Sequence, residues 1–392
     1  MKIGILLRVL WPSAVPKTAI KQTEGLIGRG HLANLIVWRE SNYKYKFEHQ
    51  LYRVPFTVIL RGKIARLSEL LNYAIFYPLM PFYRSKESAI DVQLFIALPL
   101  MLRSKYDLLV AHDQIASIVA FLTKKLFNVP YIAFLYEPLE VVSLNRAHTF
   151  IKILNKVIDT FVKAILKDAD AVVASSIPMY KWLRSRRVNS RILWIQEGCD
   201  VHHHIKPVEE RDCAVLTVSR WDRGRNPFFF LDIAEKVPYA KFIIAGSWTP
   251  KLFKDEFISE MKRRSLDSRV LVMSDIPDGV LRELYMKAKV VVRWGFEKGV
   301  PTGILEGMSF GCPIVTNEGF GGSSIIKHGI HGYIAKRIDA TEFAHYIDLI
   351  LKDNELWKKM SLNCRRLSFS YSWDKHVDKL NTLILEILKG GK

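Results

Sequence analysis

Residues 214–236 read AVLTVSRWDRGRNPFFFLDIAEK, and their pattern is the most informative about the fold. It begins with a mostly apolar run, continues through a turn rich in arginine with one glycine and one proline, and ends in a segment of helical character. This order predicts a buried strand, a charged turn and a helix. A strand followed by a helix is the repeating unit of a parallel sheet that is covered on both faces.

The same alternation of short apolar runs and longer segments extends along the whole chain. In the first half, strands are expected at residues 2–9, 32–38, 108–111, 131–135, 171–174 and 191–195, with helices at 19–29 and 115–127. In the second half, further strands are expected at residues 241–245, 270–273, 290–293, 313–316 and 332–335. The fold class is therefore expected to be α/β, with two Rossmann-like, doubly wound domains and a ligand cleft between them.

A polar segment with three consecutive histidines, residues 200–207, separates the two series and ends at Pro207. We interpret it as the connection between the domains. The first domain is placed at residues 1–203 and the second at residues 204–372. A C-terminal helix over about residues 373–392 is expected to pack back on the first domain.

Composition limits the class of protein. The 392 residues are 49% apolar and carry 58 Lys and Arg against 39 Asp and Glu, a net charge of +19, which excludes a disordered or fibrous chain. Four cysteines without Cys-x-x-Cys spacing indicate neither a disulfide framework nor a zinc site, and fit a reducing cytoplasm. Arg8 interrupts the first apolar run, which argues against a signal peptide, and no apolar run reaches bilayer length.

The charge is uneven: residues 1–200 carry a net +13 and residues 201–392 a net +6. A basic surface attracts nucleic acid, anionic lipid or phosphorylated substrates, and charge alone does not choose among them. No RRM or helix-turn-helix signature is present, so a nucleic-acid-binding protein is the weaker alternative and no nucleic-acid partner is expected.

The turn after the strand at 214–219 contains Arg220, Arg223 and Arg225. Guanidinium groups beside a helix N-terminus match the oxygens of a diphosphate. A solvated basic turn is the alternative.

A second informative stretch is the Gly- and Pro-containing loop at residues 296–313, which runs into a short helix carrying Glu306. Loop amides around Val300, Pro301 and Thr302 could approach an anion, and the Glu306 carboxylate could accept hydrogen bonds from a vicinal diol. A structural glutamate is the alternative.

Taken together, these motifs resemble the GT-B glycosyltransferases, and among them the large retaining family 4. Ile195-Gln196-Glu197-Gly198-Cys199-Asp200 is similar to the family's I-P-N-G-V-D. The other matching pieces, in chain order, are residues 111–113, 168–175, 219–227, 306–313 and 371–373.

The resemblance implies that Arg220 and Arg225 bind the donor diphosphate, with arginine at the second position where the family has lysine. It also implies that Glu306 binds the nucleotide ribose. The family's first glutamate, eight positions earlier, contacts the transferred sugar, but Lys298 stands there in this chain. Either a one-residue insertion lets Glu297 serve, or Lys298 has altered the sugar site.

The resemblance further implies transfer of a sugar from a nucleotide-sugar with retained configuration, without a metal or another cofactor. The family's frequent histidine on the acceptor side corresponds to Tyr136, so His112 and Glu137 become the acid/base candidates, with structural roles as the alternative for each. Asp168 and Asp170 match a metal-binding Asp-x-Asp pattern, but capping is favoured there. An epimerase or hydrolase of the same fold is the runner-up function.

Two segments suggest a membrane surface. Residues 70–83 are apolar and aromatic with basic flanks, and residues 149–167 place lysines among apolar residues at helical spacing. An amphipathic helix that covers the core is the alternative. With the basic first half, they predict a peripheral protein on the inner, anionic face of a membrane, acting on a lipid-linked or glycan acceptor.

Overall fold

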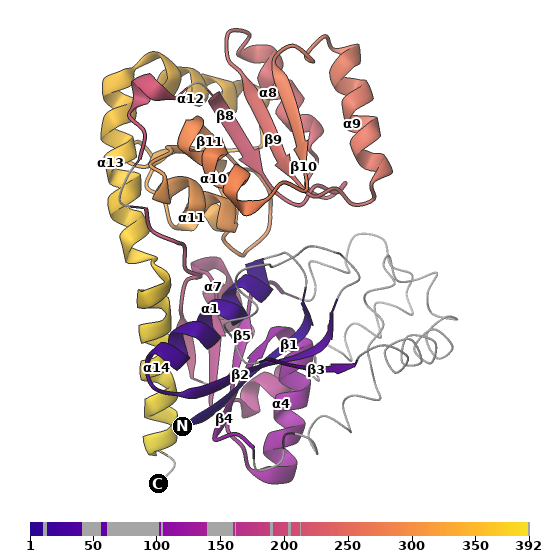
Figure 1. The fold of residues 1–392 in the computed structure, drawn as a ribbon, viewed down its shortest axis with the longest axis vertical. Helices are drawn as coiled ribbons and strands as arrows, with labels where there is room; N and C mark the ends of the chain where they lie inside the picture. The colour runs from indigo at the N-terminus through magenta and orange to yellow at the C-terminus, as the bar shows by residue number, and fades with distance from the viewer. Residues whose placement is uncertain are drawn as a thin grey trace. The chain divides into compact units, whose positions relative to one another are not determined.

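The computed structural model describes residues 1–10, 14–40, 56–60, 105–138, 162–188, 191–202, 205–211 and 213–390, together with Leu102 and Thr160 (Figure 1). The chain divides into two compact units. Unit 1 contains residues 1–197 and 373–392, and unit 2 contains residues 198–372. Unit 2 thus begins at Gly198, two residues before the segment expected to connect the domains.

Unit 1 is built on a seven-stranded parallel sheet of order β3-β2-β1-β4-β5-β6-β7. The strands are β1 Lys2–Leu10, β2 Leu32–Glu40, β3 Phe56–Leu60, β4 Leu108–His112, β5 Tyr131–Leu135, β6 Ala171–Ala174 and β7 Ile192–Trp194. Its named helices are α1 Ala14–Gly28, α4 Asp113–Phe127, α7 Ile177–Ser185 and α14 Trp373–Gly390.

Two elements of unit 1 differ from the expectation. β3, an edge strand paired with β2 alone, was not anticipated. Helix α1 begins at Ala14 rather than near residue 19 and includes Pro16 in its first turn. Proline is tolerated there because the first amide groups of a helix have no partner within the helix.

Unit 2 is built on a six-stranded parallel sheet of order β10-β9-β8-β11-β12-β13. The strands are β8 Cys213–Val218, β9 Phe242–Gly246, β10 Val270–Ser274, β11 Ala288–Val292, β12 Ile314–Asn317 and β13 Gly332–Ala335. The helices are α8 Phe228–Lys236, α9 Leu252–Arg263, α10 Asp278–Lys287, α11 Thr302–Ser309, α12 Ala340–Lys352 and α13 Asn354–Ser370, with short 3₁₀ turns at Val208–Glu210 and Gly321–Ser324. The expected pair of doubly wound α/β sheets is confirmed.

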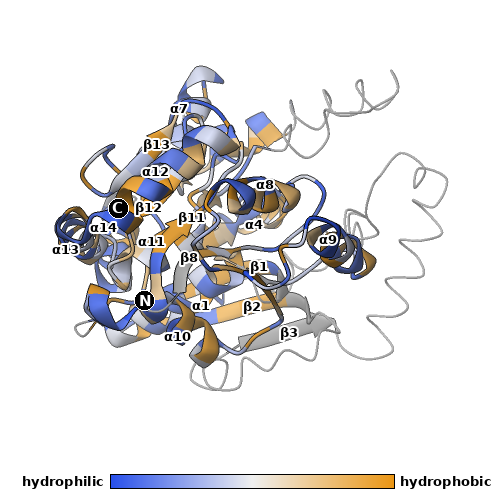
Figure 2. Cartoon of the chain, turned by 90° about the horizontal axis from the view of Figure 1, so that it is seen from above, coloured by the Kyte–Doolittle hydropathy of each residue, from blue (hydrophilic) through white to orange (hydrophobic). Residues whose placement is uncertain are grey.

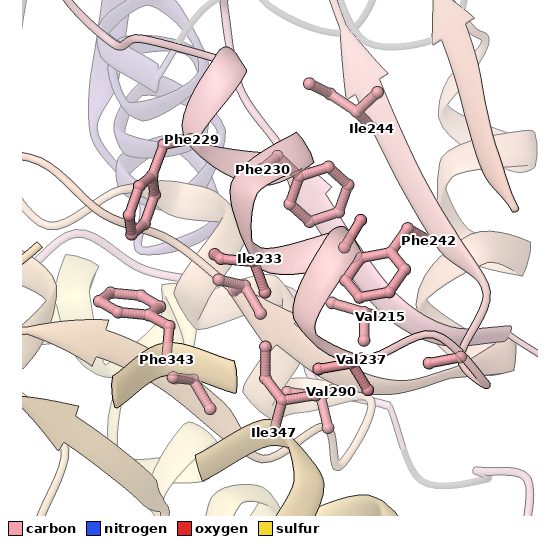
Figure 3. Close-up of a cluster of buried hydrophobic side chains, with 14 of the residues drawn as sticks. Val215, Phe229, Phe230, Ile233, Val237, Phe242, Ile244, Val290, Phe343 and Ile347 are labelled. Atoms are coloured by element: carbon pink, nitrogen blue, oxygen red, sulfur yellow. The ribbon is translucent and has the colours of Figure 1, made fainter. Parts of the chain in front are cut away.

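The strands of unit 2 are mostly apolar, and the central strands β8, β11 and β12 are largely buried. Val215 packs with α8 and α12, whereas its neighbour Leu216 packs in a second cluster with α10 and α11. Figure 3 shows the first cluster, in which Phe230 and Phe242 meet edge to face with ring centroids 5.3 Å apart. Figure 2 shows the contrast between the hydrophobic strand β11 and the largely hydrophilic exposed face of α13.

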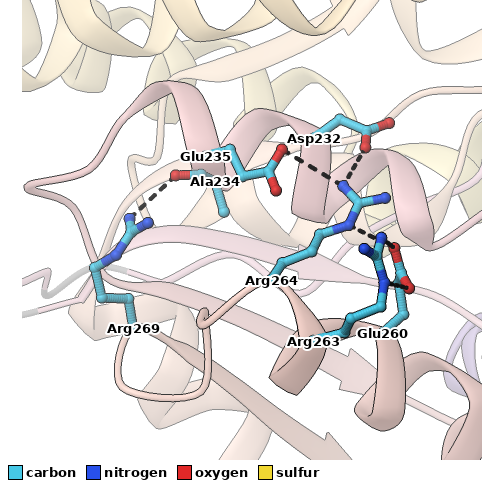
Figure 4. A network of polar contacts seen from close by, with 7 residues as sticks. All are labelled: Asp232, Ala234, Glu235, Glu260, Arg263, Arg264 and Arg269. Carbon is cyan, nitrogen blue, oxygen red and sulfur yellow. Dashed lines mark hydrogen bonds and ion pairs between the residues drawn. The ribbon is translucent and has the colours of Figure 1, made fainter.

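A polar network fixes α9 against α8 in unit 2 (Figure 4). Arg264 contacts Asp232 at 2.6 Å and Glu260 at 2.7 Å, and Arg269 donates to the carbonyl of Ala234 at 3.0 Å. Hydrogen bonds from Arg263 and Arg264 lower the pKa of Glu260 to about 2. The network therefore holds the far end of the helix that follows the arginine turn.

Helix α14 packs against α1 within unit 1. A side chain at Gly25 would meet Val377 at 2.5 Å, so glycine permits this close approach. Arg29 pairs with Asp378 at 2.6 Å, and His31 lies 2.6 Å from Asn381. The last helix of the chain is thus part of the first unit.

Candidate functional site

In the turn after β8, Arg220 and Arg225 have the Asp222 carboxylate as a common neighbour. Arg225 Nε lies 3.2 Å from Glu297 Oε1, and its Nη1 contacts the carboxylate of Asp222. Arg220 is about half exposed, with Nε 3.8 Å from Asp222 Oδ2. Asp222 also accepts from the Arg225 amide at 3.0 Å, so this aspartate shapes the turn and orients the Arg225 guanidinium.

Two buried tryptophans, Trp221 and Trp294, hold this turn through hydrogen bonds from their indole nitrogens. The indole nitrogen of Trp221 donates to the carbonyl of Ala245 at 2.9 Å, and that of Trp294 donates to the carbonyl of Arg225 at 2.9 Å. Their ring centroids are 5.6 Å apart. Because β8 and β11 are neighbours in a parallel sheet, the segments after them meet at one edge, and the Trp294 bond is one of the links between them.

Arg223 belongs to the same turn but takes a different direction. It pairs with Glu256 on α9 at 2.9 Å, and its guanidinium lies over the Phe253 ring at 5.1 Å from the centroid. The structure therefore joins Arg220 and Arg225, and separates Arg223 from them.

The loop after β11 is tied to the end of β12. Gly295 donates to and accepts from the side chain of Asn317, both at 3.0 Å, and the Gly321 amide donates to the Glu297 carbonyl at 2.7 Å. Gly295 has φ +155°, and a side chain there would lie 2.1 Å from Glu297 Oε2. Glycine at 295 thus gives the Glu297 carboxylate the space to reach Arg225.

Glu306 is on α11 and is partly exposed. The hydroxyl of Tyr285 donates to its Oε2 at 3.1 Å, and the Tyr285 ring stacks on Phe310 at 5.7 Å. Burial raises the pKa of Tyr285 well above 10, so it stays a hydrogen-bond donor. The carboxylate is therefore held in one orientation by a buried phenol.

The remaining donor-side candidates differ in accessibility. Lys298, Pro301 and Thr302 are partly exposed, whereas the side chain of Val300 is buried in the core. Pro301 has no amide proton.

His112 ends β4 in the interior of unit 1. Its Nδ1 lies 2.7 Å from the Tyr136 hydroxyl, and its Nε2 lies 3.0 Å from Gln22 Oε1. Burial, with a smaller contribution from His376, lowers the pKa of His112 to about 3. A neutral ring with both nitrogens bonded inside the unit has a structural position, which does not support His112 as a base that contacts an acceptor.

Glu197 is part of the motif at residues 195–200, and the sequence alone predicts no role for it. It follows β7, is 2% exposed, and its Oε1 lies 3.1 Å from the hydroxyl of Thr18 on α1. Burial raises the pKa of Glu197 to about 8, and the partly exposed Glu137 adds to the shift. Its one sequence signal is that a glutamate stands where the family motif has asparagine.

The Thr18 hydroxyl also lies 2.9 Å from the carbonyl of Ala14. The one proton of this hydroxyl can be donated to Ala14 or to Glu197 Oε1, and donation to Glu197 lowers its pKa against the larger effect of burial.

The Asp-x-Asp pair has lysine partners. Asp170 Oδ2 accepts from Lys124 Nζ and from the Tyr131 amide, both at 2.9 Å, and Asp168 pairs with Lys125. Both carboxylates thus serve to fasten α4 and β5.

The two segments expected at a membrane surface fall largely outside the described residues: residues 70–83 entirely, and residues 149–159 and 161 of the second. His203 and His204 also lie outside them, while the His202 ring stacks on Phe310 at 4.0 Å. In the described ranges, no helix combines the length and the apolar character needed to cross a bilayer.

Comparisons with known proteins agree with the two-unit organisation. The Glycosyltransferase Family 4 model matches residues 26–203, and the Glycosyl transferases group 1 model matches residues 201–367. A glycosyltransferase 1 domain-containing protein 1 from Xenopus tropicalis is 27% identical over 174 residues, 43% of this chain and 49% of that protein.

A Campylobacter jejuni enzyme is 25% identical over 228 residues, 56% of this chain and 60% of its own. Its name is GalNAc-alpha-(1->4)-GalNAc-alpha-(1->3)-diNAcBac-PP-undecaprenol alpha-1,4-N-acetyl-D-galactosaminyltransferase. The matched stretches thus span about half the length of these two relatives.

Solved structures share the fold over almost the whole chain. Anabaena HepE in complex with UDP and glucose has a TM-score of 0.76 at 16% identity, covering 98% of this chain and 100% of that one. Sucrose-phosphate synthase from Thermosynechococcus elongatus has a TM-score of 0.79 at 16% identity, covering 99% of each chain. The two family models and the shared fold confirm the resemblance: the chain belongs to the group 1, family 4 glycosyltransferases, retaining enzymes with the GT-B fold.

Proposed function

We propose that this protein transfers a sugar, with its configuration retained, from a nucleotide-sugar donor to a hydroxyl group of a lipid-linked or glycan acceptor at a membrane surface. The observation that carries the proposal is the arginine turn after β8. There Arg225 lies between Asp222 and Glu297, with Arg220 beside it, at the carboxyl end of a parallel sheet. This is where doubly wound folds bind nucleotides.

Arg220 and Arg225 act on the leaving group. When the bond between the sugar and the diphosphate breaks, negative charge increases on the phosphate oxygens. The Arg225 guanidinium, already oriented by Asp222, and the neighbouring Arg220 guanidinium stabilise this charge through forked hydrogen bonds. The solved complexes of Anabaena HepE with UDP and with UDP-glucose support this assignment by analogy of fold.

Two carboxylates recognise the rest of the donor. Glu306, oriented by Tyr285, accepts hydrogen bonds from the ribose hydroxyls. Glu297, which reaches Arg225 through the space left by Gly295, contacts the transferred sugar. Lys298 in that role is the alternative, and it predicts the opposite ranking of variants: Glu297→Ala should lower transfer more than Lys298→Ala if Glu297 serves.

The acceptor side rests on charge and on one relative. Residues 1–200 carry a net +13, which suits a phosphorylated lipid carrier or an anionic membrane surface. The Campylobacter relative, by its name, acts on an undecaprenol-linked glycan. Glu137, partly exposed after β5, is the proposed acid/base group for the acceptor hydroxyl.

Calorimetry with UDP tests the donor site, and Arg223 provides the matched control. Arg220→Ala and Arg225→Ala should each weaken UDP binding about tenfold to a hundredfold, since each removes a charged hydrogen bond. Arg223→Ala removes the same charge from the same turn but should leave UDP affinity within about twofold. Absence of UDP binding to the wild type, or equal losses in all three variants, would overturn the donor assignment.

Product analysis and sedimentation test the rest of the proposal. A transferase gives a glycosylated acceptor, whereas an epimerase gives an isomeric nucleotide-sugar and a hydrolase gives free sugar. Vesicles with anionic lipid should sediment the protein in a salt-sensitive way, because salt screens charge attraction. Equal sedimentation with neutral vesicles would remove the membrane surface from the proposal.

A further inference from the structure

Arg293 is a buried cation beside the proposed donor site. It directly follows β11, is 2% exposed, and its guanidinium lies between the rings of Trp221 and Phe320, at 5.6 and 5.7 Å from their centroids. Among the residues that the structure describes, nothing accepts a hydrogen bond from its Nε or Nη1. Burial lowers the pKa of Arg293 to about 10, so it remains charged at neutral pH. A charged group with unfilled donors is costly to bury unless an acceptor reaches it in another state.

Among the neighbouring charges, that of Glu297 most strongly opposes the effect of burial on the pKa of Arg293. In the structure, however, the Glu297 carboxylate is paired with Arg225, with 3.2 Å between Nε and Oε1. Its second oxygen lies in the space left by the missing side chain of Gly295. The same added side chain would lie 3.0 Å from the Phe320 ring, over which the Arg293 guanidinium lies, so Glu297 and Arg293 are both close to this ring.

A bound diphosphate changes this balance. If phosphate oxygens take the donors of Arg225, they compete with Glu297 for the same guanidinium and repel its carboxylate. The carboxylate then needs another cation, and the unfilled Nε and Nη1 of Arg293 provide the donors.

We infer that Arg293 is a positioning residue that receives Glu297 when the donor diphosphate occupies Arg225. The inference rests on the proposed function, because it takes the diphosphate to bind at Arg225. The exchange keeps Glu297 oriented beside the sugar while Arg225 serves the phosphates. A structural role, in which Arg293 fills the space between two aromatic rings, is the competing explanation.

A double-mutant cycle on UDP affinity separates the two explanations. Arg293→Met keeps an unbranched chain between the rings but leaves Glu297 without its second partner, so UDP should bind about tenfold more weakly. Glu297→Gln removes the competing charge, so Arg293→Met combined with Glu297→Gln should bind UDP within about threefold of Glu297→Gln alone. Arg293→Lys, which keeps the charge, should restore most of the affinity. If Arg293→Met weakened UDP binding as much in the Glu297→Gln background as in the wild type, the inference would be overturned.

A second cycle needs no ligand. Arg225→Met removes the partner that Glu297 has in this structure, so Glu297 should pair with Arg293 in that background. The combined effect of Arg293→Met and Glu297→Gln on the melting temperature should then depart from the sum of the single effects by about 2–4 °C, and by less when Arg225 is present. Equal coupling in both backgrounds would overturn the exchange. Failure of the wild type to bind UDP would overturn the donor site, and this cycle would still decide whether Glu297 can pass to Arg293.

Discussion

The carboxyl ends of the two sheets carry polar groups in opposite physical states. After β8 and β11 in unit 2, Arg225 and Glu297 are partly exposed and paired with each other, whereas Arg293 beside them is buried. After β4 and β7 in unit 1, His112 and Glu197 are almost fully buried and bonded inside the unit. Burial shifts the pKa of each of these two groups toward its neutral form.

The carboxyl ends of the strands in one type of fold can therefore carry groups that bind a ligand or groups that stabilise the folded state. Partly exposed ion pairs contribute little to stability, because solvent screens them, but a ligand can take over their donors. Buried neutral groups contribute to stability within a defined pH range and are not open to exchange with a ligand. Four predictions test the comparison.

The largest effect is expected at Glu197. Its pKa is about 8 in the folded chain and near 4.5 when unfolded, so the folded state binds the extra proton and loses stability as pH rises from about 4.5 to 8. Glu197→Gln keeps a hydrogen-bond donor for Thr18 without an ionisable group. The variant should gain about 3 kcal/mol in unfolding free energy, relative to the wild type, between pH 5 and pH 8.

Urea titrations at the two pH values measure this change. Glu386→Gln on α14, where the carboxylate is exposed and paired with Arg191, is the control and should stay within about 0.5 kcal/mol at both pH values. If the relative stability of Glu197→Gln did not change with pH, Glu197 would be ionised in the folded state and the contrast between the units would fail.

The next effect concerns His112 and has the opposite direction in pH. Its folded pKa of about 3 lies below the unfolded value of 6.5, so the wild type loses stability as pH falls from about 6.5 toward 3. When the pH is lowered from 6.5 to 5, the free energy of unfolding of His112→Asn should fall by about 2 kcal/mol less than that of the wild type. The exposed His345 supplies a control substitution to asparagine, and an equal change in both variants would show that burial of His112 is not the cause.

A smaller effect is expected at Glu306 in unit 2, and on activity rather than stability. Glu306→Gln should lower kcat/KM for the donor about 10- to 30-fold, because hydrogen bonds from the ribose hydroxyls to a charged carboxylate are replaced by weaker ones. The melting temperature should change little, since the side chain is partly exposed. Glu318→Gln, at an exposed carboxylate after β12, should leave kcat/KM unchanged. A large loss of stability with unchanged kcat/KM would place Glu306 with the buried groups of unit 1.

Much of the fold could be predicted from sequence because strands buried on both faces are continuous apolar runs. All six strands of unit 2 were expected within two residues of their observed bounds, from β8 to β13. The edge strand β3 was not predicted, and α1 begins five residues before the predicted start, with Pro16 in its first turn. Position in the sheet and position within a helical turn depend on neighbours that a local pattern does not contain.

The candidate site divides in the same way. Arg220 and Arg225 could be predicted because charge and glycine concentrate in one turn after a strand. Arg293 and Glu197 are single charged residues next to apolar runs, and local sequence does not distinguish a buried charge from an exposed one. Their burial follows from packing against Trp221 and Phe320 in one case and against α1 in the other.

The smallest effect is expected at Tyr285, where a buried group serves an exposed one. Tyr285→Phe removes the hydroxyl that donates to Glu306 at 3.1 Å and keeps the stacking on Phe310. The proposed contacts between Glu306 and the ribose remain, and one hydrogen bond that orients Glu306 is lost. We therefore expect kcat/KM for the donor to fall about threefold. Combined with Glu306→Gln, the substitution should add less than its single effect, since the carboxylate that it orients is gone. A full additional threefold loss in the double variant would mean that Tyr285 acts through packing, and the link between buried and exposed groups in unit 2 would be broken.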